Sequence, residues 1–186
     1  MFETVRNAFK IKDLRKKLFY TFFALIVVRI GSQLPVPGVK YEAIREMFNS
    51  QKSLDFFNQL TGGSFESMSI FALNITPYIT ASIIIQLLTI AIPRLEELHK
   101  DGEEGRKKLT EYTRYVTIGL SVMESAAMAI GFGNSGYLTD DKITFTSVAV
   151  IIVSLTAGSA FLMWLGEQIT EKGVGNGISI ILLYNI

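Results

Sequence analysis

The sequence contains no cysteine and only one histidine, His99, among its 186 residues. Without cysteine there is no disulfide framework, no thiolate zinc site and no cysteine nucleophile. One histidine cannot form a two-histidine metal site, and His99 lies among charged residues, where a solvated side chain is the simplest interpretation. No pairing of a nucleophile with a base is evident elsewhere. We therefore expect neither an enzyme nor a bound cofactor or metal.

The chain also has almost no net charge, because 18 Lys and Arg residues oppose 17 Asp and Glu residues and leave +1. Such a balance gives no overall attraction to nucleic acid, and we expect no direct nucleic-acid partner. The charges are segregated between long apolar runs in a sequence that is 49% hydrophobic. This clustering, rather than the composition itself, predicts a membrane protein.

The apolar run that organises the sequence is Ile70–Ile92, which has no charged residue in 23 positions. About 20 residues cross the hydrocarbon core of a bilayer as a helix. Asn74 and Pro77 interrupt this run, and proline suits the first turn of a new helix better than a helix interior. We predict a break near Asn74 and a helix that restarts at Thr76 or Pro77. Backbone at membrane depth must be buried in protein or line a cavity, so the break favours a path through the membrane. A proline-kinked packing helix is the alternative.

Four other apolar runs predict an all-α membrane protein, a polytopic helical bundle. They comprise residues 18–34, 116–132, 143–165 and 178–186. Residues 93–115 and 166–177 are predicted to be loops between them. The last run is nine residues long, too short to cross a bilayer, so we expect the sequence to be incomplete at this end. No secretory cleavage pattern follows the first run, which we expect to remain in the mature protein.

Basic residues set the predicted topology. Residues 1–17 and 93–115 each carry six Lys or Arg residues, whereas the other connecting segments carry three at most. Since lysine and arginine accumulate in cytoplasmic loops, we place these two segments in the cytoplasm, with residues 35–69 and 133–142 outside. The segment 1–17 also has apolar residues at helical spacing. It is predicted either as an amphipathic helix on the membrane surface or as a solvated basic tail.

Glu124 is the only carboxylate inside the predicted spans. An ionisable group within the membrane usually faces protein or water, so Glu124 could be a proton relay, a polar partner of another helix or a gate residue. Met123, Ala126, Ala127 and Ala129 around it indicate close helix packing, which favours the last two roles.

Branched apolar residues recur every four positions beside the break, at Ile75, Ile79 and Ile83, and Ile178 and Leu182 repeat the spacing. This spacing places such residues on one face of a helix. A row of this kind is more often a packing surface. Beside a broken span it could instead form an apolar constriction that holds back water and ions.

Strings along the whole chain closely resemble motifs of the SecY family, whose members are channel subunits of the bacterial Sec translocon. They are Phe71–Leu88, Arg29–Ser32 with Pro35–Gly38, Gly105–Lys108 with Tyr112–Tyr115, and Met163–Ile180. The resemblance implies the N-terminal half of a ten-span, inverted-repeat channel, with spans 1 to 4, a broken second span and the start of span 5. It also implies that such a fragment should not conduct alone.

The resemblance further implies roles for individual residues. It places a plug at about residues 55–71, below a ring of pore residues, and it identifies half of a lateral gate and a basic cytoplasmic loop. The residues are Asp55, Phe57, Gly62, Gly63, Phe65 and Met68 for the plug, Ile75, Ile79, Ile178 and Leu182 for the pore ring, Thr80 and Glu124 for the gate, and Arg106, Lys107 and Lys108 for the loop. Asn74 stands where glycine is common in the family, and Leu182 where isoleucine is frequent.

The implied function is a protein-conducting channel that passes unfolded secretory polypeptides and releases membrane proteins sideways into lipid. The implied partners are the SecE and SecG subunits, the SecA motor, the ribosome, signal sequences, nascent polypeptide and membrane lipid. The implied location is the bacterial plasma (inner) membrane, with the N-terminus in the cytoplasm. A secondary transporter is the alternative, and it would need polar groups such as Asn74, Thr76 and Thr80 to converge at the break. An intramembrane enzyme is a third, weaker interpretation.

Overall fold

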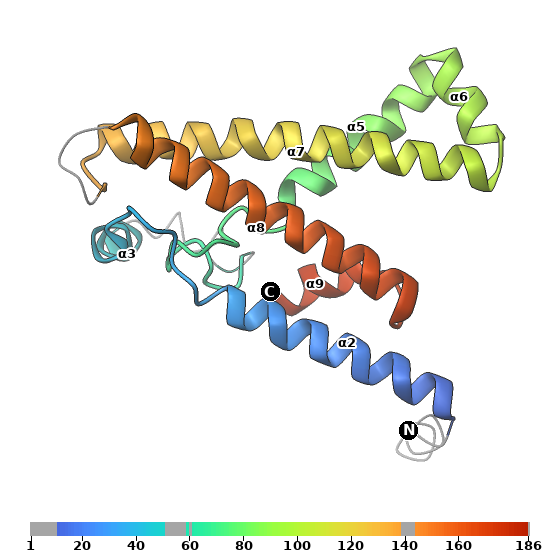
Figure 1. Ribbon diagram of the computed structural model, residues 1–186, viewed down its shortest axis with the longest axis horizontal. Helices are drawn as coiled ribbons and strands as arrows, with labels where there is room; N and C mark the ends of the chain where they lie inside the picture. Colours follow the sequence, from blue (N-terminus) through green and yellow to red (C-terminus); the bar gives the residue numbers. More distant parts are fainter. Residues whose placement is uncertain (1–10, 51–58, 60, 139–143, 186) are drawn as a thin grey trace.

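The computed structural model (Figure 1) describes residues 11–50, 59, 61–138 and 144–185, and among these residues all regular structure is helical. Two isolated antiparallel bridges, Pro35 with Ser69 and Val39 with Leu138, join the loops. The described helices are α2 (Lys12–Gly31), α3 (Tyr41–Ser50), α5 (Thr76–Ala91), α6 (Pro93–Lys100), α7 (Glu103–Asn134), α8 (Phe145–Lys172) and α9 (Gly177–Asn185). The predicted all-α bundle is confirmed.

The long helix α8 lies at the centre of the bundle, between α7 on one side and α2 on the other (Figure 1). The short helix α9 packs against both α8 and α2, whereas α5 packs along α7. After α5 the chain bends by 103° into α6. A glycine turn with φ of +74° at Gly102 then returns it into α7.

Among the described residues, α7 and α8 are long and apolar enough to cross a membrane, and the bent pair of α5 and α6 adds a third span if counted as one. Helix α2 is not among them, because five of its first six residues are charged. The predicted first span, 18–34, is also shorter than expected, since the helix ends at Gly31. A Cβ at this glycine would lie 2.0 Å from a ring carbon of Phe71, so the helix end is tightly packed against the break.

Two of the predicted loops are wrong in their extent. Residues 93–115 are almost entirely helical, because they form α6 and the beginning of α7 around a two-residue turn. Gly105 lets these helices touch, since a Cβ there would lie 1.7 Å from the Leu98 carbonyl oxygen. Helix α8 continues to Lys172, which leaves only residues 173–176 as the loop before α9. High charge and glycine content favoured loops, but the packing of neighbouring helices extends the helical structure.

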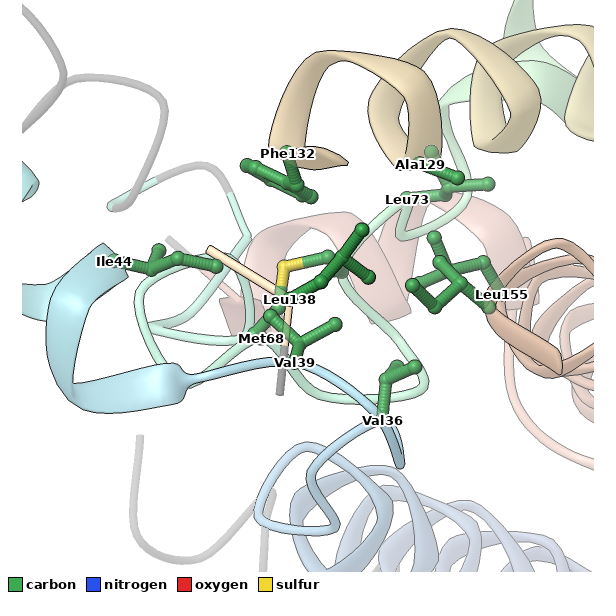
Figure 2. Close-up of a cluster of buried hydrophobic side chains, with 11 residues drawn as sticks. Val36, Val39, Ile44, Met68, Leu73, Ala129, Phe132, Leu138 and Leu155 are labelled. Atoms are coloured by element: carbon green, nitrogen blue, oxygen red, sulfur yellow. The ribbon is translucent and has the colours of Figure 1, made fainter. Parts of the chain in front are cut away.

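Two groups of buried apolar side chains hold the bundle together. The first, which we call the cap cluster, lies where α7 ends and α8 begins (Figure 2). It consists of Val36, Val39, Ile44, Met68, Ala72, Leu73, Ala129, Phe132, Leu138, Ile151 and Leu155. The second, which we call the central cluster, joins α2, α8, α9 and the start of α5. It consists of Ala24, Val28, Phe71, Ile75, Leu162, Leu165, Ile169 and Ile181.

Candidate functional site

The break in the apolar run Ile70–Ile92 lies where Asn74 and Pro77 predict it. Asn74 has a φ of +53°, in the left-handed region that asparagine tolerates better than most residues. Helix α5 then begins at Thr76, with Pro77 in its first turn, where the missing N–H leaves no hydrogen bond unmade. Met68 is the other residue besides glycine with a positive φ, +44°, among the described residues. The chain from 61 to 75 is therefore a series of turns between helices.

The backbone of this segment is hydrogen-bonded within the protein. The Val36 N–H donates to the Met68 carbonyl (2.8 Å), and the Ile70 N–H donates to the Leu34 carbonyl (2.9 Å). The Asn74 N–H donates to the Phe71 carbonyl at 2.8 Å. Non-helical backbone at membrane depth is stable only with such internal partners. The loop after α2 thus acts as a short antiparallel partner that fixes the break.

Helix α8 packs against the break at backbone distance. A Cβ at Gly158 would lie 1.9 Å from the Ile70 carbonyl oxygen, so only glycine fits there. One turn later, the ring of Phe161 stacks on Phe71, with ring centroids 6.0 Å apart. These contacts fix the height of the break along α8.

Three of the four residues assigned to the pore ring by resemblance meet in the central cluster. Ile75 is fully buried there, and half-buried Ile79 and Ile178 pack against it. The Cδ1 atoms of Ile75 and Ile178 lie 3.5 Å and 3.4 Å from the place that a Cβ at Gly166 would occupy. Both side chains therefore converge on one turn of α8. Leu182 is half-buried and is not a member of the cluster.

The residues assigned to the plug are placed differently from one another. Asp55 and Phe57 lie outside the described residues. Gly62 and Gly63 form a turn with φ of +62° and +78°, and half-buried Phe65 packs on the cap cluster. Met68 is fully buried within that cluster (Figure 2). The end of the predicted plug nearest α5 is thus part of a core, not a free segment.

The two residues assigned to the lateral gate differ in their surroundings. Half-buried Glu124 lines a hollow of about 460 Å³ between α7 and the break. Thr80 is exposed on α5, one turn beyond Thr76, which does line the hollow. The other lining residues are Thr61, Phe65, Ala72, Leu73, Ala127 and Met128. Met123 is 70% exposed, so the close packing expected around Glu124 is not provided by that residue.

The basic residues Arg106, Lys107 and Lys108 are exposed on the first turns of α7 rather than in a loop. In the preceding helix α6, the hydrogen bond from Lys100 to Glu96 (2.5 Å) holds the pKa of that carboxyl below its usual range. Helices α7 and α8 are joined near the same end by Arg114, whose guanidinium bonds both carboxylate oxygens of Glu167 at 2.9 Å.

The packing face of α7 was not predicted, although the sequence contains its pattern. Small polar residues recur at four-residue spacing and are all buried, namely Thr113, Thr117, Ser121 and Ser125. Each of the four hydroxyl groups donates a hydrogen bond to a carbonyl of the preceding turn, as the Thr117 hydroxyl does to the Thr113 carbonyl at 2.7 Å. The Ser125 hydroxyl also lies 3.3 Å from that of Thr156 on α8. Small residues of this kind let two membrane helices approach closely.

Comparisons with known proteins agree with this geometry. The sequence profile of the SecY family matches residues 69–186. The chain is similar to the protein translocase subunits SecY of Bacillus subtilis (47% identical) and Halalkalibacterium halodurans (46%), in each case over 100% of this chain and 43% of the relative. It is 42% identical to SecY of Streptomyces coelicolor, over 100% of this chain and 45% of that protein. The chain thus spans less than half the length of these curated relatives.

Two solved structures have a similar fold. One is Sec61 in the canine ribosome–channel complex from the endoplasmic reticulum, and the other is a protein-conducting channel. Each superposes with a TM-score of 0.62 at 21% sequence identity, over 92% of this chain and 36% of the other. The sequence identity to the bacterial relatives and the match to the family profile, which covers the break, α5 and every later described helix, lead to one conclusion: the chain belongs to the SecY family.

Proposed function

We propose that this chain forms part of a protein-conducting channel in which the break and α9 supply an apolar constriction. The channel would pass unfolded secretory polypeptides across the membrane and release hydrophobic segments sideways into lipid. The observation that carries this proposal is the lining of the break. Branched apolar side chains of the break and of α9, Ile75 and Ile178, meet on α8 at the point where the helix of the second span is interrupted.

The constriction would act physically, without chemistry on the substrate. An apolar ring excludes water and ions because they cannot be solvated in it. An extended polypeptide can displace the side chains, since isoleucine offers it no directional bonds. Half-buried Ile79 and Ile178 keep part of their surface free in this chain, as residues that must contact a passing substrate would.

A small-molecule transporter is less well supported by the same region. That function needs polar side chains that converge on a substrate. Asn74 is buried and bonded to Asn185 at 2.9 Å, whereas Thr76 and Thr80 are exposed on α5. These three residues therefore do not form a common polar pocket.

Partners and location follow from the same proposal. We propose the bacterial inner membrane, with the N-terminal segment and the α6–α7 hairpin in the cytoplasm, because both are rich in Lys and Arg. Signal sequences, nascent polypeptide and lipid would contact the channel interior and gate. The subunits SecE and SecG would surround it, and the SecA motor or the ribosome would deliver substrate at the cytoplasmic side.

Site-specific photocrosslinking to a stalled secretory chain tests the proposed function. A crosslinker at Ile79, in the intact membrane complex that contains this chain, is compared with one at Val150, which is exposed on α8. We expect strong crosslinks to the stalled polypeptide from Ile79 and none from Val150. Equal crosslinking from both positions, or none from either, would show that the break is only structural.

A further inference from the structure

Two asparagine side chains meet beside the apolar constriction. The Asn185 Nδ2 group donates a hydrogen bond to Asn74 Oδ1 at 2.9 Å. Asn74 is only 2% exposed and lies between residues of the central cluster in the sequence, Phe71 and Ile75. Hydrogen bonds in apolar surroundings are electrostatically stronger than those in water, so this contact is well placed to influence how the helices separate.

The bond connects the two segments that supply the proposed pore ring. Asn74 directly precedes Ile75, and Asn185 follows Leu182 by three residues on α9. Residues three apart on a helix lie on the same face. The amide pair therefore holds α9 against the break on the face of the helix that carries Leu182.

Asn185 also contacts the segment assigned to the plug. A Cβ at Gly62 would lie 3.2 Å from the Asn185 carbonyl oxygen and 3.3 Å from its Cα. The Gly62 carbonyl in turn accepts a hydrogen bond from Arg29 Nη1 on α2 at 3.0 Å. One polar junction thus brings together α2, the Gly62 turn, the break and α9.

We propose that the Asn74–Asn185 pair is a latch that positions α9 in the closed channel, an inference that rests on the proposed function. Widening the constriction requires α9 to move away from the break. That movement separates the two amides in apolar surroundings, where an unmade hydrogen bond is costly. The latch therefore opposes spontaneous opening and lowers the ion leak of the resting channel.

The choice of Asn74 variant separates the latch from the backbone role of the same residue. Asn74→Gly keeps a residue that adopts a positive φ readily but removes the amide. Asn185→Leu removes the donor with little change in volume. Leu183→Ala, at a 74% exposed position on the same helix, is the matched control.

The test is the ion conductance of the resting complex in planar bilayers, measured for each variant and for the Asn74→Gly/Asn185→Leu pair. We expect each single variant to raise the leak roughly three- to tenfold, as the loss of one buried hydrogen bond would. The double variant should leak no more than the leakier single variant, because both changes remove the same bond. Leu183→Ala should stay near the unmodified level.

An Ile79→Asn variant in the same bilayers distinguishes the two proposals. If Ile79→Asn leaks but Asn74→Gly and Asn185→Leu do not, the latch is refuted and the constriction stands. Additive leaks in the double variant would also overturn the latch. If no variant leaks, including Ile79→Asn, both proposals fail. The thermal stability of each purified complex shows that the protein tested is folded.

Discussion

The cap cluster and the central cluster both bury isoleucine and leucine completely, yet they are held together in different ways. In the cap cluster, backbone bridges tie the loops to one another, since Pro35 pairs with Ser69 and Val39 with Leu138. In the central cluster, helices meet through side chains, with the Asn74–Asn185 amide pair beside them.

This difference indicates a division of roles. A network of backbone hydrogen bonds around buried side chains resists deformation, because every broken bond leaves a buried polar group. Side-chain packing between helices can loosen by small shifts and reform. The cap cluster therefore serves as the frame that fixes the break, and in the proposed channel the central cluster would be the part that a translocating polypeptide widens.

The largest expected loss of stability comes from a substitution that forces the break, together with the cap cluster that fixes it, away from α8. Gly158→Leu places a side chain where the Ile70 carbonyl lies, and we expect a loss of about 3 kcal/mol or more of stability. The thermal stability of the purified complex measures it. Gly119→Leu, on an open part of α7, is the control and should not destabilise the protein. Equal stability of the two variants would contradict the close approach.

Truncation within the cap cluster should come next. Met68→Ala removes a fully buried side chain and is expected to cost about 2–5 kcal/mol, through lost burial and the cavity that remains. Limited proteolysis of the complex should then show faster cleavage in the 61–75 segment. A variant as resistant as the unmodified protein would show that this cluster does not fix the break.

The corresponding truncation beside the central cluster should lower stability less than Met68→Ala does, but should change channel function more. Ile178→Ala shortens a half-buried side chain, so we expect a loss of less than about 2 kcal/mol. The resting ion leak should nevertheless rise, because the ring becomes wider. Both quantities are measured on the same preparation, with Met68→Ala as the reference. A loss of stability equal to that of Met68→Ala would remove the distinction between the clusters.

The smallest effect is expected at the surface of the cap region. Arg45 of α3 forms an ion pair with Glu66 at 3.1 Å, and its side chain is 68% exposed. Exposed ion pairs contribute about 0.2–1 kcal/mol, so Arg45→Ala should lower thermal stability only slightly, and less in high salt. A loss as large as that from Met68→Ala would mean that this pair, rather than the buried cluster, anchors the segment.

The sequence predicts those features that depend on neighbouring residues. The break could be located from the sequence because Asn74 and Pro77 have local conformational preferences that stand out within an apolar run. The central cluster could be predicted only in part. Ile181 is fully buried, whereas Ile180 beside it is only half-buried, although both residues are isoleucine. Its burial depends on α2 and α8, which are distant in the sequence.

The α6–α7 hairpin and the Asn185 contact show why the rest could not be predicted. A high charge density favoured a loop over residues 93–115, but the contact of Gly105 with Leu98 stabilises two packed helices. Asn185 is one of many polar residues that could have formed a buried contact, and the apolar residues around it in the sequence do not single it out. Its partner is 111 positions away, and no local pattern indicates such a pair.

The most direct test of the central claim is the resting ion conductance of an Ile79→Asn complex compared with a Val153→Asn complex. Ile79 packs against the central cluster, whereas Val153 is 66% exposed on α8. We predict a clear increase in leak for Ile79→Asn, because a polar side chain allows water to enter the constriction, and no change for Val153→Asn. Equal conductance of both variants and the unmodified complex would contradict the assignment of the constriction to α5.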